Sequence, residues 1–211
     1  MVRILVADDH AVVRHGLRQL FSLAPELEVV AEAKNAWEAI ERLRQGGVDV
    51  LLLDMTMPGL SGIDLIRRAR AEAPAVPVLV LSMHADTQIA ARAIRAGAHG
   101  YLTKDSEPEV LIEAIRQVSR GGKFIDPALA TKMVFGAAGV LEDEAPSAEM
   151  TDREYQVFLA LVQGRSLVEI ADELHLSAKT ISTHKFRLMR KLGLKNVSEL
   201  VRYAVRHGIV Q

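Results

Sequence analysis

The sequence of 211 residues contains no cysteine, so disulfide bonds and thiolate metal sites are excluded. It also lacks an apolar run of the roughly 18 residues that a membrane-spanning helix requires. Residues Met1 to Ala7 lead directly into Asp8, without the long apolar core of a secretory signal peptide. We therefore expect a soluble cytoplasmic protein with no membrane partner.

The chain has little net charge, with a formal value of −1 at pH 7. This average hides an uneven distribution. Residues 151–211 hold ten lysines and arginines against six acidic residues, a surplus of four positive charges. Residues 136–150 hold four acidic residues and no lysine or arginine. A basic C-terminal region of this kind suggests a polyanionic partner.

The length predicts two modest domains. In the N-terminal part, short apolar runs alternate with segments of helical periodicity. Strands are predicted at 3–7, 27–33, 48–54, 77–82 and 99–103, and helices at 11–24, 35–46, 61–74, 86–96 and 106–121. Five strands that alternate with five helices define a doubly wound α/β domain with a parallel sheet and right-handed crossovers.

The remaining residues predict a connection and a second, all-α domain. The first domain is placed at residues 1–122, and residues 123–149 form a connecting helix and a flexible acidic linker without periodicity. An ordered acidic loop is the alternative. Residues 150–211 predict four helices, at 151–163, 166–174, 178–192 and 197–207. Their starts carry capping boxes of Thr151 with Glu154, Ser166 with Glu169, and Asn196 with Glu199, and an N-cap at Ser177.

One stretch, Val48 to Gly59, points to chemistry. Val50 to Leu53 shows no polar alternation, which is typical of a strand covered on both faces. The run ends in Asp54, and the chain then breaks at Met57-Pro58-Gly59. Open parallel sheets bind ligands at the carboxyl ends of their strands, where Asp54 is expected. Taken alone, Asp54 could equally cap the next turn.

Asp8 and Asp9 end the first predicted strand, as Asp54 ends the third. If these strands are neighbours, as in the 2-1-3-4-5 order of flavodoxin-like sheets, three carboxylates converge at one edge. A hard divalent cation relieves their repulsion, and a partly hydrated site of oxygen ligands favours Mg²⁺. A carboxylate beside such a cation is also a competent nucleophile toward phosphorus.

A hydroxyl and an ammonium are expected at the same edge, because Ser82 ends the fourth strand and Lys104 follows the fifth. Both groups suit a phosphoryl group attached to Asp54. Individually, Ser82 could be a strand-end cap and Lys104 a solvated cation. Five features at the ends of four strands argue against such separate explanations.

With these residues, the N-terminal domain resembles the receiver domain of two-component response regulators. The resemblance implies that Asp54, in Asp-Met-Thr-Met-Pro-Gly, accepts a phosphoryl group. It also implies that Asp9, Asp54 and the backbone carbonyl of Thr56 bind Mg²⁺, and that Asp8 acts through water. Ser82 and Lys104 would then bind the phosphoryl oxygens.

The resemblance further implies a switch and a control of lifetime. Tyr101 would turn inward when Ser82 moves, and Thr56 and His84 occupy positions that tune the lifetime of the phosphoaspartate in this family. Lys104 is followed by Asp105 where many receivers have proline, so the cis peptide bond usual there is not carried over.

Residues 166–192 predict a helix, a tight turn and a second helix that is basic and free of acidic residues from 178 on. In helical phase, Ile181, Leu188 and Leu192 form the buried stripe. The opposite face contains Lys179, Thr183, Phe186, Arg187 and Arg190, with Ser182 at its edge. On DNA, Ser182 and Thr183 would reach base edges, Phe186 would contact thymine methyl groups, and Lys185, Arg190 and Lys191 would bind phosphates. Alternatively, Phe186 packs against the other domain or a partner subunit.

This segment is similar to the LuxR-type helix-turn-helix, through Thr151-Asp152-Arg153-Glu154, Glu169-Ile170-Ala171, residues 179–184 (Lys-Thr-Ile-Ser-Thr-His) and Lys191-Leu192-Gly193. The match includes Thr180 among the DNA-binding positions. Leu167 stands where the family often has asparagine. The last helix pairs two modules in the family, which implies dimerisation through Val197, Leu200, Val201, Ala204 and Val205.

A receiver followed by this module resembles a NarL/FixJ-type response regulator. The resemblance implies a phosphorylation-gated transcription regulator, phosphorylated by a sensor histidine kinase, that binds paired half-sites of double-stranded DNA as a homodimer. It implies no enzymatic activity beyond its own phosphorylation and dephosphorylation.

Three other classes fit less well. An aspartyl phosphohydrolase similar to the haloacid dehalogenases has Asp-x-Asp after the first strand, where Asp8-Asp9-His10 stands here. A small-molecule sensor of the LuxR type should have a ligand pocket in place of the carboxylates. A flavin-binding domain needs a hydroxyl-rich phosphate loop where the acids lie.

Overall fold

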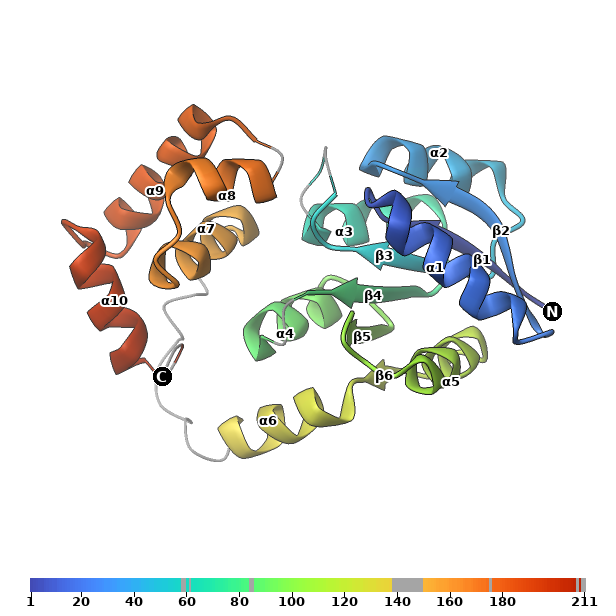
Figure 1. Cartoon of the computed structure of the whole chain (residues 1–211). Coiled ribbons are helices and arrows are strands. Elements are labelled where there is room, and N and C mark those ends of the chain that lie inside the picture. Colours follow the sequence, from blue (N-terminus) through green and yellow to red (C-terminus); the bar gives the residue numbers. More distant parts are fainter. Residues whose placement is uncertain are drawn as a thin grey trace. The chain divides into compact units, whose positions relative to one another are not determined.

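The computed structural model describes residues 1–57, 60, 62–83, 86–137, 150–174, 176–207 and 209. The chain forms two compact units, Met1–Leu141 and Glu142–Gln211 (Figure 1). The predicted acidic linker falls mainly on residues 138–149, which lie outside the described residues. Its flexibility and the predicted domain boundaries therefore stay predictions.

The first unit contains a six-stranded sheet of order β2-β1-β3-β4-β5-β6, in which all neighbours pair parallel. Its strands are β1 (Val2–Ala7), β2 (Leu27–Ala33), β3 (Val50–Asp54), β4 (Val78–Ser82), β5 (Gly100–Thr103) and β6 (Phe124–Ile125). The predicted 2-1-3-4-5 order is confirmed. The predicted number of five strands is wrong, because Phe124 and Ile125 pair with β5. A strand of two residues is too short to show periodicity in the sequence.

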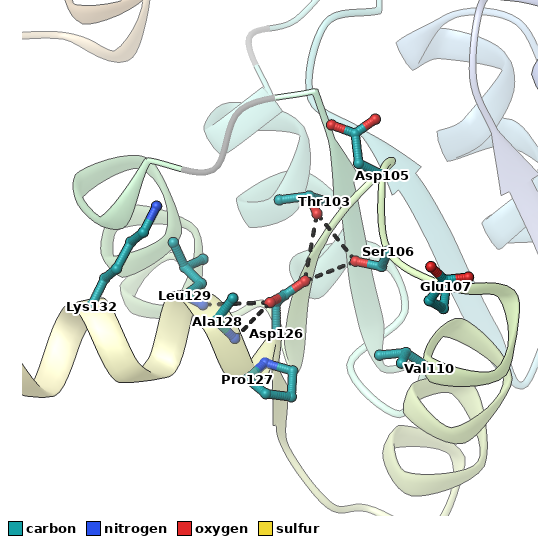
Figure 2. Close-up of a pocket in the computed structure, with 10 residues that line it drawn as sticks. All are labelled: Thr103, Asp105, Ser106, Glu107, Val110, Asp126, Pro127, Ala128, Leu129 and Lys132. Atoms are coloured by element: carbon teal, nitrogen blue, oxygen red, sulfur yellow. Dashed lines mark hydrogen bonds between the residues drawn. The ribbon is translucent and has the colours of Figure 1, made fainter.

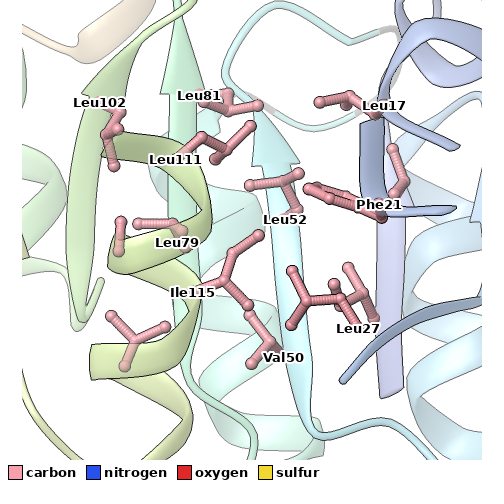
Figure 3. Close-up of a cluster of buried hydrophobic side chains, with 14 of the residues drawn as sticks. Leu17, Phe21, Leu27, Val50, Leu52, Leu79, Leu81, Leu102, Leu111 and Ile115 are labelled. Atoms are coloured by element: carbon pink, nitrogen blue, oxygen red, sulfur yellow. The ribbon is translucent and has the colours of Figure 1, made fainter. Parts of the chain in front are cut away.

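Helices cover both faces of the sheet. They are α1 (Ala11–Ser22), α2 (Ala36–Gln45), α3 (Gly62–Glu72), α4 (Thr87–Arg95) and α5 (Pro108–Ser119). A further helix, α6 (Pro127–Ala137), packs against α4. Leu17 and Phe21 of α1 and Leu111 and Ile115 of α5 form a buried cluster with one face of the sheet (Figure 3). The alternate sheet residues face the other side, where α2, α3 and α4 pack.

Because both faces are covered, every residue of β3 and β4 is buried. Charged groups on these strands can therefore approach solvent only at the strand ends. The burial pattern thus places Asp54, the last residue of β3, at the edge where the sequence predicts a site.

The second unit contains α7 (Asp152–Val162), α8 (Leu167–Glu173), α9 (Ala178–Lys191) and α10 (Val197–Arg206). The first two predicted capping boxes, which pair Thr151 with Glu154 and Ser166 with Glu169, are confirmed. The N-cap at Ser177 is confirmed as well, because its side chain accepts the backbone N–H of Thr180.

The third predicted box is only half formed. The Asn196 side chain accepts the backbone N–H of Glu199, but the Glu199 carboxylate accepts the N–H of Lys195 and not that of Asn196. Within the described ranges, no helix has the length and apolar character to cross a lipid bilayer.

Candidate functional site

Asp8 and Asp54 lie next to each other at the carboxyl end of the sheet. Ala7 of β1 pairs with Leu53 of β3, so the residue after each emerges at the same edge. Both acids are 2% exposed. The Lys104 ammonium contacts both, with Nζ 2.6 Å from Oδ2 of Asp8 and 3.1 Å from Oδ2 of Asp54. The fold thus brings together three groups that are far apart in the sequence.

Asp9 and His10 extend this cluster toward solvent. The imidazole Nδ1 of His10 lies 2.9 Å from Oδ1 of Asp9 and 3.3 Å from Oδ1 of Asp8. Among the described residues, Asp8, Asp9, His10 and Asp54 each offer an atom within 4.8 Å of the others. Sequence reasoning did not assign His10, although its place directly after the acidic pair was a signal.

Thr56 encloses the Asp54 carboxylate from the following turn. Its backbone N–H donates to Oδ1 at 3.2 Å, and its hydroxyl lies 3.0 Å from each carboxylate oxygen. The sequence assigned to Thr56 only its carbonyl and an effect on lifetime, because turn geometry does not follow from residue spacing. Pro58 and Gly59, where the chain was expected to break, lie outside the described residues.

Burial raises the pKa of the Asp54 carboxyl above its ordinary value, since removal from water penalises the charged form. Lys104 opposes this rise, and the Asp8 carboxylate adds to it. For Lys104, burial acts to lower the pKa, but the carboxylates of Asp54 and Asp8 outweigh burial and raise it. The site therefore holds a charged lysine between two buried acids.

The raised pKa predicts a stability effect at Asp54. The folded chain holds the proton on the Asp54 carboxyl more tightly than the unfolded chain, in which this carboxyl has a pKa of about 3.9. The unfolding free energy therefore falls as the pH rises from the pKa of the unfolded chain through the raised pKa of Asp54 in the folded chain. At neutral pH without Mg²⁺, Asp54→Asn should therefore stabilise the first unit, because the amide places no charge in the buried site. Urea unfolding in chelator at several pH values measures this, and a variant less stable than wild type at neutral pH would contradict it.

Ser82 and Tyr101 lie one and two strands beyond Asp54. Ser82 ends β4 and is buried, and Tyr101 of β5 is fully buried and hydrogen-bonded to Ser82. Burial raises the pKa of the Tyr101 phenol, so it stays neutral. The ring of Tyr101 is therefore turned inward in this structure. His84, the other residue expected to tune lifetime, lies outside the described residues.

Hydrogen bonds also hold the loop that follows Lys104 against α6. The Lys104–Asp105 peptide bond is trans. A cavity of about 370 Å³ opens beside it, between the β5–α5 loop and α6 (Figure 2). On its wall, Ser106 Oγ donates to Oδ2 of Asp126 at 2.8 Å, and Oδ1 of Asp126 accepts the N–H groups that begin α6. This network ties the loop after Lys104 to α6.

In the second unit, α9 has one buried and one exposed face. Ile181 and Leu188 are fully buried as predicted, and Met189 is buried beside them. Leu192, predicted to be buried, is only half-buried because it caps the end of the helix. Phe186 is 66% exposed. The predicted DNA-contact residues divide into exposed Lys179, Ser182, Thr183, Arg187, Arg190 and Lys191 and half-buried Thr180 and Lys185.

Several polar groups on α9 have partners within the unit. The Thr180 hydroxyl lies 2.8 Å from that of Ser177, and the Thr183 hydroxyl donates to the carbonyl of Lys179 at 3.0 Å. The Lys191 ammonium lies 2.6 Å from the buried carboxylate of Glu154. The sequence assigned Lys191 to a DNA phosphate and did not predict this ion pair.

The predicted dimerisation residues of α10 do not share one surface. Leu200 and Ala204 are fully buried in their own unit, where Tyr203 packs edge-on against Phe158 of α7. They therefore belong to the core of the module, and their assignment to a dimer surface is corrected. Val205 is exposed, and Val197 and Val201 are half-buried, so these three remain available.

Residues 4–116 match the family described as the response regulator receiver domain, and residues 148–204 match the bacterial regulatory proteins of the luxR family. The chain is 34% identical over 209 residues to the response regulator UvrY of Escherichia coli K12, covering 99% of this chain and 96% of that protein. It is 32% identical over 210 residues to the response regulator GacA of Pseudomonas aeruginosa, covering 100% and 98%.

Among solved structures, the chain is similar to RcsB from Salmonella enterica serovar Typhimurium bound to promoter DNA in the presence of the phosphomimetic BeF3⁻. The TM-score is 0.65 at 27% sequence identity, and the match covers 96% of this chain and 97% of that one. Both the receiver and the helical unit thus have counterparts in a single known protein.

Proposed function

The chain belongs to the NarL/FixJ-type response regulators, which join a receiver to a LuxR-type DNA-binding domain, and we propose that phosphorylation of Asp54 gates its DNA binding. A sensor histidine kinase donates the phosphoryl group in the cytoplasm. The family consists of DNA-binding transcription regulators, and the only chemistry we assign to this chain is its own phosphorylation and dephosphorylation. The enclosure of Asp54 by Asp8, Lys104 and Thr56 carries the proposal.

Mg²⁺ fits the donor set at this site. The carboxylates of Asp9 and Asp54 and the backbone carbonyl of Thr56 would supply the hard oxygen ligands that Mg²⁺ prefers, and Asp8 would act through water. When bound, Mg²⁺ neutralises charge on the phosphoryl oxygens and on these acids.

Asp54 acts as the nucleophile. One carboxylate oxygen forms a bond to phosphorus while the bond from phosphorus to the imidazole nitrogen of the donor histidine breaks, and the electron pair stays on that nitrogen. Lys104, already 3.1 Å from the carboxylate, donates hydrogen bonds to the phosphoryl oxygens, as the Ser82 hydroxyl does. Neither residue changes its protonation state.

The proposed switch depends on the Ser82 hydroxyl, which is hydrogen-bonded to Tyr101 and would also bind the phosphoryl group. Drawing this hydroxyl toward a phosphoryl group favours the arrangement in which Tyr101 is buried against it. Phosphorylation thus shifts the population toward the state with the ring inside, and this shift controls dimerisation and DNA binding.

The output is the exposed face of α9. We propose that dimers bind paired half-sites, with Ser182, Thr183 and Phe186 at base edges in the major groove and Lys185 and Arg190 at phosphates. Lys179, Thr180 and Arg187 border these contacts. Similarity to RcsB, whose solved complex contains promoter DNA, supports this assignment. Val197, Val201 and Val205 of α10 are the proposed dimer contacts.

Phosphorylation is expected to produce dimers. Full-length protein with Mg²⁺ and a small phosphodonor should sediment at about twice the mass of untreated protein, because the inward switch state favours the paired form. Asp54→Asn should keep the untreated mass in both conditions and serves as the control. An unchanged mass in fully phosphorylated wild type would contradict the proposed link between phosphorylation and dimerisation.

A further inference from the structure

The ion pair between Lys191 and Glu154 joins the last turn of α9 to the first turn of α7. Lys191 Nζ lies 2.6 Å from Oε2 of Glu154, whose side chain is 3% exposed. Two thirds of the Lys191 side chain is covered as well. A charge pair this enclosed has a defined geometry, unlike a pair on the surface.

The Glu154 oxygen that binds Lys191 also serves the helix cap. Oε2 accepts the backbone N–H of Thr151 at 2.8 Å, and the Glu154 N–H is bonded to the Thr151 hydroxyl in return. Burial acts to raise the pKa of the Glu154 carboxyl, but hydrogen bonds from Lys191 and Thr151 outweigh it and hold the pKa low. Glu154 is therefore a charged and fixed anchor at the start of α7.

The helical phase of α9 places Lys191 at the edge of the buried stripe of the helix, although the residue as a whole is exposed. Ile181, His184, Leu188 and Lys191 recur at intervals of three and four residues, so they form one stripe along the helix. Ile181 and Leu188 of this stripe are fully buried and His184 is half-buried. Arg190, which is exposed like Lys191, lies about 100° from it on the side away from the buried stripe, so the two residues differ in phase and not in exposure.

We propose that Lys191 acts in DNA recognition as a positioning residue that holds the C-terminal end of α9 through Glu154, and not as a phosphate contact. The Ser177 cap holds the other end of the helix. With both ends held, the exposed residues between them keep one register against base edges. This inference rests on the proposed function, since it takes α9 as the helix that reads DNA.

The first test compares Lys191→Met with Arg190→Met in the full-length phosphorylated protein. The probe is a duplex that the wild type enriches from a random-sequence pool. Arg190→Met should lower the slope of log affinity against log salt by about 0.9, the value for one lost phosphate contact. Lys191→Met should leave that slope unchanged but weaken specific binding by on the order of tenfold, as a misaligned base contact does. A slope lowered equally in both variants would overturn the proposal.

For Glu154→Gln, the two hypotheses about Lys191, a phosphate contact and a positioning role, predict opposite changes in DNA affinity. Glutamine also completes a capping box, so α7 keeps its cap, and no positive charge is lost. If Lys191 contacts phosphate, freeing it from Glu154 should tighten binding to every duplex. If it positions α9, binding to the enriched duplex should weaken by on the order of tenfold, while binding to a scrambled duplex should not weaken.

Binding of Glu154→Gln to the enriched duplex as tight as that of wild type, or tighter, would overturn the proposal. Far-UV circular dichroism at the assay temperature shows that each variant is folded. The Arg190→Met variant distinguishes failure of the proposed function of α9 from failure of the positioning role of Lys191. If α9 does not read DNA, Arg190→Met has no effect on the salt slope. If only the positioning role fails, Arg190→Met lowers the slope and Lys191→Met lowers it equally.

Discussion

Asp54→Asn is expected to reduce phosphoryl incorporation to background. With Mg²⁺ and a small phosphodonor, the wild type should take up one acid-labile phosphoryl group per chain, since Asp54 supplies the attacking oxygen. An amide at this position keeps the shape of the side chain but is not a nucleophile toward phosphorus. Labelling with a radioactive donor, followed by acid treatment, measures the loss.

Asp49→Asn is the matched control for this experiment. Asp49 directly precedes Val50, the first residue of β3, and its carboxylate is paired with Arg3 at the surface. The same chemical change there should leave incorporation unchanged. Equal labelling of Asp54→Asn and wild type would assign the phosphoryl group to another residue and remove the basis of the proposed gate.

Substitutions on the exposed face of α9 are expected to divide into two kinds. Arg190→Ala should weaken binding to all duplexes and lower the salt slope by about 0.9, because a phosphate contact is independent of sequence. Phe186→Ala should instead change the preferred sequence, because its ring is 66% exposed and suited to thymine methyl groups. Thr183→Ala should act in the same way.

Selection of duplexes from a random pool, followed by affinity measurements over a range of salt, separates these two effects. Each base pair whose contact is lost should account for about 1–3 kcal/mol of discrimination. If Arg190→Ala changed sequence preference without changing the salt slope, the rotational phase assigned to α9 would be wrong.

Strands β1, β3, β4 and β5 were predictable from the sequence because most of their residues are apolar and buried, whereas β2 also contains exposed and half-buried residues. The order of the five strands was taken from flavodoxin-like sheets. Parallel strands buried on both faces leave an unbroken hydrophobic signal, as Val50 to Leu53 shows. The sixth strand, of two half-buried residues, leaves none. Its pairing with β5 depends on where the chain returns after α5, which is a tertiary property.

The site was predictable to the extent that it depends on strand ends. Asp54 ends a buried strand, and Asp8 and Lys104 directly follow strands close to it in the sheet, so their convergence was expected from strand order. The hydroxyl of Thr56 is brought in by turn geometry, for which the spacing of residues contains no signal. The imidazole of His10 was not assigned, although its place directly after Asp8 and Asp9 was a signal. The inward placement of Tyr101 depends on a rotamer, which a strand pattern does not predict.

In the second unit, periodicity predicted the buried stripe of α9 but not its details. Met189 is buried and Leu192 only half-buried, because the helix ends at Lys191. Lys191 and Arg190 are both basic residues at the end of a basic helix, and sequence alone treated them alike. Only the position of Glu154, 37 residues earlier, separates their roles.

The proposed gate is tested most directly by the affinity of the full-length protein for its enriched duplex, measured with and without phosphodonor in the presence of Mg²⁺. The proposed mechanism predicts that phosphodonor tightens binding by the wild type and has no effect on Asp54→Asn, while Asp49→Asn responds like the wild type. Equal affinities of phosphorylated and unphosphorylated wild type would contradict it, because DNA binding would then be independent of the state of Asp54.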